Sequence, residues 1–129
     1  MIVRGAVDQI RALSTVCRHR LMLVVPPGEH GNSRQFVCPY HRWTYGLDGR
    51  LESALHMGRN PSFDLSSICL PQYRLEVWND LIWVNLDDNA SPFAPKLAEL
   101  EEVMSVYRGP AGGVMTELYD KTWGGNWKS

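Results

Sequence analysis

The chain has 129 residues, of which 44% are apolar and 21% charged, and this length is typical of one globular domain. Its 13 basic and 14 acidic side chains leave a net charge of −1, which provides no electrostatic basis for binding nucleic acid or an anionic membrane. The apolar run at residues 21–25 is far shorter than the roughly twenty residues of a membrane span. No secretory signal is visible at the N-terminus, so we expect a cytoplasmic protein without nucleic-acid or membrane partners.

Short β-strands separated by turns are predicted for the first half of the chain. Strand-like runs occur at residues 2–4, 10–13, 35–37 and 43–45. The first two of these runs are expected to form a hairpin, and the pair Asp48-Gly49 predicts a tight hairpin turn after the fourth. Residues 53–69 show no regular pattern and are expected to form an irregular loop.

A second hairpin is predicted where residues 73–78 and 81–86 flank Asn79-Asp80, a typical two-residue turn. The first arm alternates apolar with polar residues, so one of its faces should contact water. The second arm is apolar almost throughout, which predicts a strand that is covered on both faces.

One helix is predicted near the C-terminus, with Pro95 at its first position. Apolar residues recur at helical spacing at Leu97, Leu100, Val103, Met104 and Tyr107, and they indicate ordinary packing. The helix should end at Gly109-Pro110, and residues 114–123 are expected to form a last strand. We therefore expect a domain at residues 1–94, followed at 95–129 by a helix and a connecting segment.

Four side chains with metal-binding chemistry form two mixed pairs, Cys17-x-His19 and Cys38-x-x-His41. The chain has three cysteines, and an odd number without a secretory signal argues against a disulfide framework. Each pair supplies one thiolate and one imidazole. Two such loops can hold a Rieske-type [2Fe–2S] cluster, in which two histidines replace two cysteines on one iron.

A tetrahedral zinc site with two cysteines and two histidines is the alternative. The ligand types suit zinc as well as they suit an iron–sulfur cluster. The spacing favours the cluster, because zinc fingers pair like ligands with like, whereas each pair here is mixed. The four residues alone leave both options open.

The residues around both pairs extend the pattern: Val16-Cys17-Arg18-His19-Arg20, and Cys38-Pro39-Tyr40-His41-x-Trp43-Thr44-Tyr45-x-Leu47-Asp48-Gly49. These blocks resemble the Rieske domain of ring-hydroxylating oxygenase α subunits, and the resemblance runs from about residue 2 to the end of the chain. It implies a mainly β Rieske fold: small antiparallel sheets, a two-loop cluster-binding subdomain and a C-terminal helix. It also implies a [2Fe–2S] cluster bound by Cys17, His19, Cys38 and His41.

The resemblance further implies a role in electron transfer. Electrons from NAD(P)H would arrive through a reductase or a ferredoxin. They would continue to a mononuclear non-haem Fe(II) in a catalytic domain, usually that of a neighbouring oxygenase subunit. The parent enzyme would hydroxylate an aromatic or related small organic substrate with O2. A free-standing Rieske-type ferredoxin is the alternative, although such a carrier does not need residues 95–129.

Three positions separate this chain from Rieske proteins of the cytochrome bc type. Those proteins carry a disulfide between the two loops, at positions that are Met22 and Tyr40 here. They also carry a serine that donates a hydrogen bond to a cluster sulfur, at the position of Trp43. Because such hydrogen bonds raise the reduction potential, we expect a low potential here, toward the lower end of the Rieske range at about −150 mV.

The chain also departs from the oxygenase pattern. Leu21 and Arg42 stand where glycine is usual, which predicts either a somewhat different loop geometry or a subgroup that does not need glycine at these positions. Few residues precede Cys17, so the first strands of the domain are expected to be missing. A sequence like that at residues 126–128 opens the catalytic domain in the family, and the remaining histidines, His30 and His56, match no iron-binding triad. We therefore expect a fragment that is not catalytic alone.

Other side chains near the motifs have more general roles. Arg18 and Arg20 flank His19 and are interpreted either as surface charge or as contacts to a partner subunit or electron donor. Tyr40, Trp43 and Tyr45 are expected to surround the cluster, with Trp43 and Tyr45 shielding it from water. Cys69 lies between Ile68 and Leu70 and is predicted to be a small buried apolar residue.

Overall fold

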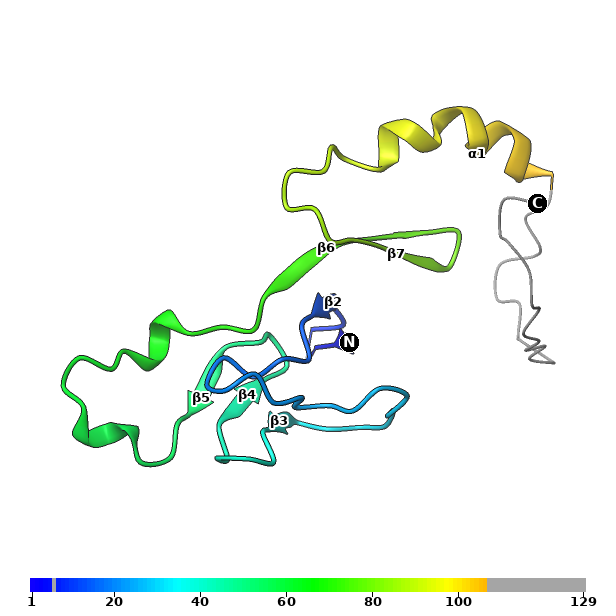
Figure 1. The fold of residues 1–129 in the computed structure, drawn as a ribbon. Coiled ribbons are helices and arrows are strands. Elements are labelled where there is room, and N and C mark those ends of the chain that lie inside the picture. The colour runs from blue at the N-terminus through cyan, green and yellow to red at the C-terminus, as the bar shows by residue number, and fades with distance from the viewer. Residues whose placement is uncertain (6, 107–129) are drawn as a thin grey trace, which may run out of the picture. The chain divides into compact units, whose positions relative to one another are not determined.

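The computed structural model describes residues 1–5 and 7–106, and it divides the chain into two compact units, Met1–Ser91 and Pro92–Ser129 (Figure 1). Among the described residues, no helix combines the length and the apolar character needed to cross a membrane.

The first unit consists of two small antiparallel sheets. The larger has the strand order β1-β2-β6-β7, with strands β1 (Ile2–Arg4), β2 (Ile10–Leu13), β6 (Gln72–Trp78) and β7 (Leu81–Asn85). The smaller has the order β3-β4-β5, with strands β3 (Gln35–Val37), β4 (Thr44–Gly46) and β5 (Leu51–Ser53). The mainly β fold is therefore confirmed, and β4 begins one residue later than predicted.

The β6–β7 hairpin extends beyond the sheet to which it belongs. β2, which pairs with β1 on its other side, pairs with β6 only at Gln72 and Tyr73, the first two residues of β6. β7 pairs with residues 74–78 of β6. The turn is the predicted one, with positive φ at both Asn79 and Asp80, as a two-residue hairpin turn requires.

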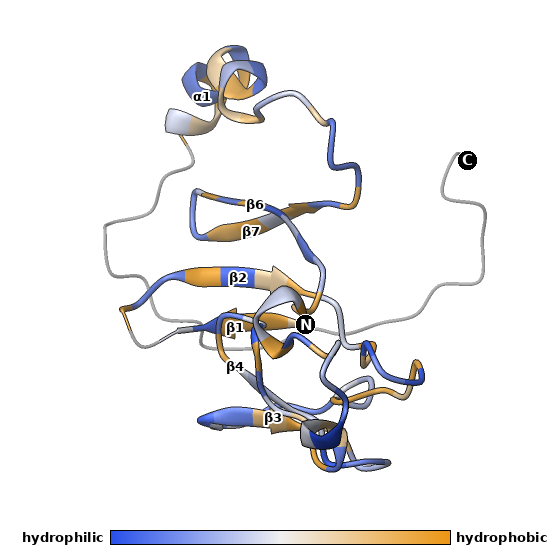
Figure 2. Ribbon diagram, turned by 90° about the vertical axis from the view of Figure 1, so that its left-hand side faces the viewer, coloured by the Kyte–Doolittle hydropathy of each residue, from blue (hydrophilic) through white to orange (hydrophobic). Residues whose placement is uncertain are grey.

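Every residue of β7 is exposed, although its colouring in Figure 2 is largely hydrophobic. The expectation that this strand is covered on both faces is therefore wrong. Within the described residues β7 pairs with β6 alone, and no element packs over its faces to bury the apolar side chains.

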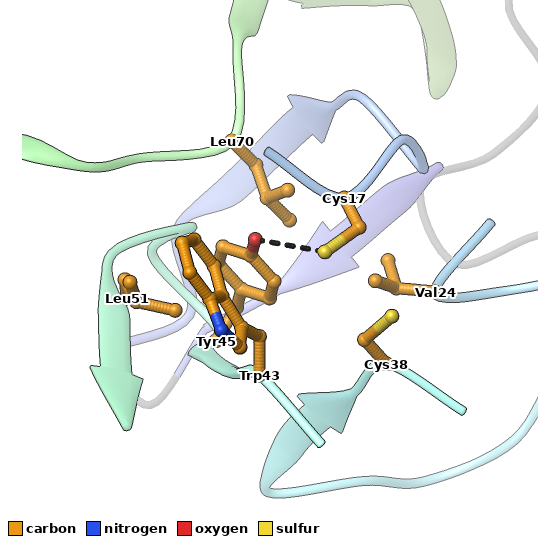
Figure 3. Close-up of a cluster of buried hydrophobic side chains, with 7 residues drawn as sticks. All are labelled: Cys17, Val24, Cys38, Trp43, Tyr45, Leu51 and Leu70. Carbon is orange, nitrogen blue, oxygen red and sulfur yellow. Dashed lines mark hydrogen bonds between the residues drawn. The ribbon is translucent and has the colours of Figure 1, made fainter. Parts of the chain in front are cut away.

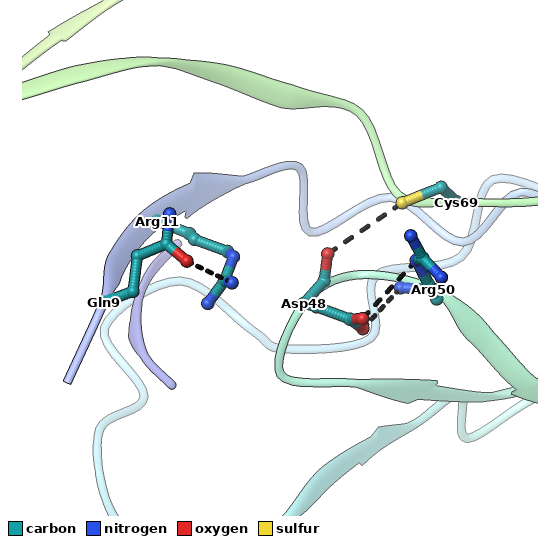
Figure 4. A network of polar contacts seen from close by, with 5 residues as sticks. All are labelled: Gln9, Arg11, Asp48, Arg50 and Cys69. Atoms are coloured by element: carbon teal, nitrogen blue, oxygen red, sulfur yellow. Dashed lines mark hydrogen bonds and ion pairs between the residues drawn. The ribbon is translucent and has the colours of Figure 1, made fainter. Parts of the chain in front are cut away.

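The predicted turn at Asp48-Gly49 joins β4 to β5. The backbone N–H of Gly46 donates to the carbonyl of Arg50 at 2.9 Å, and the Asp48 carboxylate accepts from the backbone N–H of Arg50 at 3.0 Å (Figure 4). Gly49 has φ +85°, and a Cβ there would lie 3.2 Å from Leu13 Cδ2 and 3.3 Å from Cys69 Sγ.

Cys69 is exposed rather than buried, so its predicted burial is wrong. The backbone of Leu70 donates to Gly49 and that of Leu51 donates to Ile68, which gives the chain near Cys69 a strand-like course. Ile68 and Leu70 pack into the core. Because side chains alternate along an extended chain, Cys69 between them faces outward.

The segment at residues 53–69 is more regular than predicted. It contains two single-turn 3₁₀ helices, η1 (Met57–Arg59) and η2 (Leu65–Ser67). Met57, Phe63 and Leu65 pack against the main core, so the segment covers one side of it.

The second unit begins with a 3₁₀ turn, η3 (Ala94–Leu97), which continues as the helix α1 (Ala98–Ser105). Pro95 lies in the first turn, as predicted. Leu97 is buried, whereas Leu100 and Val103 are exposed. The predicted helix end at Gly109-Pro110, the strand at residues 114–123 and the segment 126–128 lie outside the described residues.

Two loops of the first unit share one backbone pattern. In the loop after β2, the Cys17 N–H donates to the Met22 carbonyl at 2.8 Å and the Leu21 N–H donates back to Cys17 at 3.1 Å. In the loop between β3 and β4, Cys38 donates to Trp43 at 2.8 Å and Arg42 donates back to Cys38 at 3.1 Å. Each loop is therefore a tight turn that starts at a cysteine.

The fifth residue of each turn has a left-handed backbone, with φ 56° at Leu21 and φ 60° at Arg42. Glycine adopts this conformation readily, whereas other residues pay about 1–2 kcal/mol. Both turns therefore have the left-handed backbone conformation that glycine favours, although leucine and arginine occupy these positions. The alternative that these positions need no glycine-like backbone is therefore wrong, whereas a loop geometry different from that of the family stays a prediction.

The crowding at Gly49 leads to a prediction about stability. We expect Gly49→Ala to lower the free energy of unfolding by about 1–3 kcal/mol, because the new methyl group meets Leu13 and Cys69 at a left-handed position. Gly58→Ala is the matched control, since no atom lies within 4 Å of its Cβ position. Chemical denaturation measures both, and equal stability of the two variants would contradict the packing described here.

The left-handed turns lead to a second stability prediction. Leu21→Gly should raise the free energy of unfolding by about 0.5–1 kcal/mol, because it relieves the backbone at a position whose side chain is 73% exposed. Leu55 is also an exposed loop residue but lacks a positive φ, so Leu55→Gly should lower stability. If Leu21→Gly destabilises as much as Leu55→Gly, the strain at residue 21 is refuted.

Candidate metal centre

The two turns carry the four side chains that the sequence singled out. Cys17 and Cys38 are 1% and 2% exposed, and both belong to the main core with Trp43, Tyr45 and Leu70 (Figure 3). His19 and His41 are half-buried, and their ring centroids are 4.6 Å apart. The structure therefore brings two thiols and two imidazoles from separate loops to one end of the first unit.

Aromatic rings hold both imidazoles in place. Trp43 stacks on His19 with a centroid distance of 4.6 Å and an interplanar angle of 7°, and Phe63 contacts Trp43 edge-on at 5.7 Å. Tyr40 lies 3.8 Å from the His41 ring but is itself exposed. Trp43 and Phe63 thus support His19 from the core side, while Tyr40 covers His41 from the surface.

Tyr45 links the second turn to the first. Its hydroxyl lies 3.2 Å from Cys17 Sγ and accepts the backbone N–H of Arg18 at 3.0 Å. Burial raises the pKa of Tyr45 above its ordinary value, and the hydrogen bond with Cys17 adds to the shift. The phenol therefore keeps its proton and can donate a hydrogen bond to a thiolate sulfur.

Sequence reasoning predicted a shielding role for Tyr45 and missed this hydrogen bond. The alternation of Trp43 and Tyr45 indicates that both face the core. No local pattern indicates which distant loop the hydroxyl reaches.

The imidazole of His19 is held in the form that binds metal. Partial burial lowers the pKa of His19, and the His41 ring and the Arg20 guanidinium lower it further. A neutral imidazole has a free lone pair on one ring nitrogen, as metal ligation requires.

His41 Nδ1 is buried and has no hydrogen-bond partner within the part of the chain that the structure describes. Leaving a buried polar atom unpaired costs about 1–3 kcal/mol, and a lone pair directed at a metal ion removes that cost. The buried indole Nε1 of Trp43 is the other such atom among these residues, and no described residue accepts from it. The donor set of two buried thiols and two imidazoles fits a Rieske cluster.

No three His, Cys, Asp or Glu side chains within the described ranges gather as they would around a single metal ion. A Rieske cluster has a different requirement, because each of its two irons takes two protein ligands.

The two other histidines lie outside these turns, whereas three arginines lie on them. His30 and His56 are exposed loop residues; the His30 ring lies 3.3 Å from the carbonyl of Gly28, and His56 precedes η1. Arg18, Arg20 and Arg42 are exposed on the turns themselves.

Comparison with known proteins identifies the same region. Residues 1–74 match the Rieske [2Fe-2S] domain family. The glycine betaine monooxygenase oxygenase subunit of Pseudomonas aeruginosa is 37% identical over 108 residues, which cover 83% of this chain and 24% of that protein. The 2-aminobenzenesulfonate 2,3-dioxygenase α subunit of Alcaligenes sp. is 29% identical over 133 aligned positions, covering 100% of this chain and 33% of the relative.

Solved structures of Rieske oxygenases have a similar fold over most of this chain. A quaternary ammonium Rieske monooxygenase superposes with a TM-score of 0.74 at 30% identity, over 81% of this chain and 30% of the other. Naphthalene 1,2-dioxygenase from Rhodococcus sp. superposes with a TM-score of 0.74 at 29% identity, over 82% of this chain and 24% of the other. The chain thus spans about a quarter to a third of the length of these proteins.

These matches decide between the two metal centres that the sequence left open, in favour of an iron–sulfur cluster over zinc. The family match and the fold of the solved structures both belong to Rieske [2Fe–2S] proteins, and the two turns present the cysteine and histidine ligands that such a cluster requires. The chain belongs to the Rieske [2Fe–2S] domain family, in the branch found in Rieske oxygenase α subunits.

Proposed function

We propose that Cys17 and Cys38 bind one iron of the [2Fe–2S] cluster and that His19 and His41 bind the other. The observation that carries this assignment is the repeated turn, which presents one thiol and one imidazole from each loop, with His41 Nδ1 buried and unpaired among the described residues. When bound, such a cluster takes up and releases one electron, at a potential raised by its imidazole ligands.

The chain's own residues give this centre an inner and an outer side. The two cysteines are buried in the core with Trp43, which keeps water from the sulfur side. The histidines are half-buried and lie beside exposed Tyr40. Electrons therefore enter and leave on the histidine side.

We propose that the centre relays electrons within a Rieske oxygenase α subunit. A reductase or a ferredoxin would supply electrons that originate in NAD(P)H, and a mononuclear non-haem Fe(II) in a neighbouring oxygenase subunit would receive them. The substrate would be an aromatic or related small organic molecule. The names of the relatives refer to quaternary ammonium compounds as well as to aromatic ones, so both classes fall within this proposal.

The ligand assignment predicts the effect of exchanging one donor atom. His41→Cys should keep a [2Fe–2S] cluster but lower its reduction potential, because an anionic thiolate replaces a neutral imidazole. His56→Cys is the control, since His56 is an exposed loop residue. Voltammetry of the loaded proteins measures both potentials, and an unchanged value for His41→Cys would show that His41 is not a ligand.

The hydrogen bond from Tyr45 predicts a smaller shift. Tyr45→Phe should lower the potential by about 40 mV, which corresponds to about 1 kcal/mol of preferential stabilisation of the reduced state for one electron. Tyr73→Phe serves as the control, because Tyr73 lies on β6 in the other sheet. Equal potentials for wild type and Tyr45→Phe would mean that the phenol does not act on a ligand sulfur.

A further inference from the structure

The orientation of the His19 ring depends on the rings around it, because no described residue forms a hydrogen bond with this imidazole. Metal-binding histidines usually donate their second ring N–H to a carboxylate or a carbonyl, which fixes the plane of the ring. Here the indole of Trp43 lies almost parallel to the imidazole, at an interplanar angle of 7°. Within the described residues, this stacking takes the place of the usual hydrogen bond.

Trp43 has no hydrogen bond of its own to fix the indole. Its buried Nε1 has no acceptor among the described residues, so packing alone determines how the indole is turned. One of its two ring contacts within these residues is to His19, the group that it supports. The other is to Phe63, which meets the indole edge-on at 5.7 Å and an interplanar angle of 65°. Because edge-to-face pairs are directional, Phe63 is the ring that can stop the indole from turning.

The backbone on both sides of Phe63 is held by side-chain hydrogen bonds. Before it, the Asn60 side chain accepts from the backbone N–H of Ser62 at 3.0 Å, and the Asn60 carbonyl accepts from that of Phe63 at 3.1 Å. After it, the Asp64 carboxylate accepts from the backbone N–H of Ser66 at 2.9 Å and from its hydroxyl at 2.6 Å. Such local bonds define the course of a turn. The ring is thus presented to the core from a segment with a fixed conformation.

The second imidazole has a different kind of support. His41 is covered by Tyr40, whose ring is tilted at 40° to it and is 54% exposed. His19 is therefore held from the core through Trp43, whereas the ring that covers His41 is itself in contact with solvent. Loss of the core support should affect one imidazole and leave the other unchanged.

We propose that Phe63 is a positioning residue for the cluster, and that it acts through Trp43 to hold the His19 imidazole in a single orientation. The inference rests on the proposed function, in which His19 is a ligand. Because neutral imidazoles leave their iron with less ligand charge, the added electron is expected there. A ligand that keeps its orientation when the electron arrives reduces the rearrangement that electron transfer requires. Phe63 thereby favours fast electron transfer, although it belongs to neither cysteine turn.

Pulsed EPR of the reduced, loaded chain with ¹⁵N-labelled histidine tests this proposal. The coupling that remains in His41→Cys identifies the nitrogen of His19. In Phe63→Leu, which keeps an apolar side chain but removes the ring, this coupling should spread over about twice its wild-type range, because the imidazole adopts more than one orientation. The coupling from His41 should stay unchanged. Equal broadening of both couplings, or of neither, would overturn the proposal.

Control variants separate positioning from packing. Leu65→Ala is the matched control, because Leu65 is half-buried in the same loop and packs against the same core but carries no ring. It should lower stability in chemical denaturation, as Phe63→Leu does, yet leave both nitrogen couplings as in wild type. Phe63→Tyr keeps the ring and should keep the narrow His19 coupling. Phe63→Met is a second ring-free variant for the same comparison and decides the matter if Phe63→Leu does not take up the cluster.

Film voltammetry provides a second readout, the electron-transfer rate constant at zero driving force. This rate constant does not depend on a change in the reduction potential, so it reports the rearrangement alone. It should fall severalfold in Phe63→Leu and stay at the wild-type value in Leu65→Ala and Phe63→Tyr. A wild-type rate constant in Phe63→Leu would contradict the positioning role.

The outcomes distinguish the role of Phe63 from the ligand assignment on which it rests. If the wild-type chain shows no coupling to histidine nitrogen, the ligand assignment has failed and the positioning role fails with it. If wild type shows two couplings but Phe63→Leu gives the same spectrum as Leu65→Ala, the ligand assignment stands and the positioning role of Phe63 is refuted.

Discussion

The first unit depends on one backbone motif that occurs twice. Each copy is a turn that starts at a cysteine, whose backbone N–H donates to the carbonyl of the residue five positions later. The residue just before that carbonyl has a left-handed backbone conformation. Cys17 and Cys38 occupy the same place in these turns, and Leu21 and Arg42 occupy the same strained place. The motif directs each cysteine into the core while the histidine of the same turn stays near the surface. Two thiols and two imidazoles from two separate loops are thereby brought together in the first unit.

The surrounding core makes this arrangement rigid. Trp43 stacks on His19 and is held in turn by Phe63, so the segment at residues 53–69 acts on the centre through one ring. Tyr45 joins the turns directly, because its hydroxyl meets both Cys17 Sγ and the backbone of Arg18. The side chains that contact His19 and Cys17 are thus also side chains that pack the core, so under the proposed ligand assignment we expect a change in one of them to alter both stability and potential.

Features set by neighbouring residues could be predicted from the sequence. The hairpin turns at Asn79-Asp80 and Asp48-Gly49 have local signatures, and the mixed Cys/His pairs are specific enough to indicate the family. Predictions failed where partners distant in the sequence decide the outcome. β7 is exposed because no described element packs over its apolar side chains, and Cys69 faces outward because its neighbours pack inward. The hydrogen bond between Tyr45 and Cys17 joins two loops, and no pattern within either loop encodes it.

The central claim is that one iron of the cluster is bound by the imidazoles of both turns. Pulsed EPR of the reduced, loaded chain tests it most directly when the histidines are labelled with ¹⁵N, because electron spin on the iron couples strongly only to a nitrogen that is bound to it. Ligation by His19 and His41 should give two distinct histidine nitrogen couplings, each of which changes with the label, and one of them should be lost in His41→Cys. Spectra with no coupling to histidine nitrogen, or couplings that persist unchanged in His41→Cys, would contradict it.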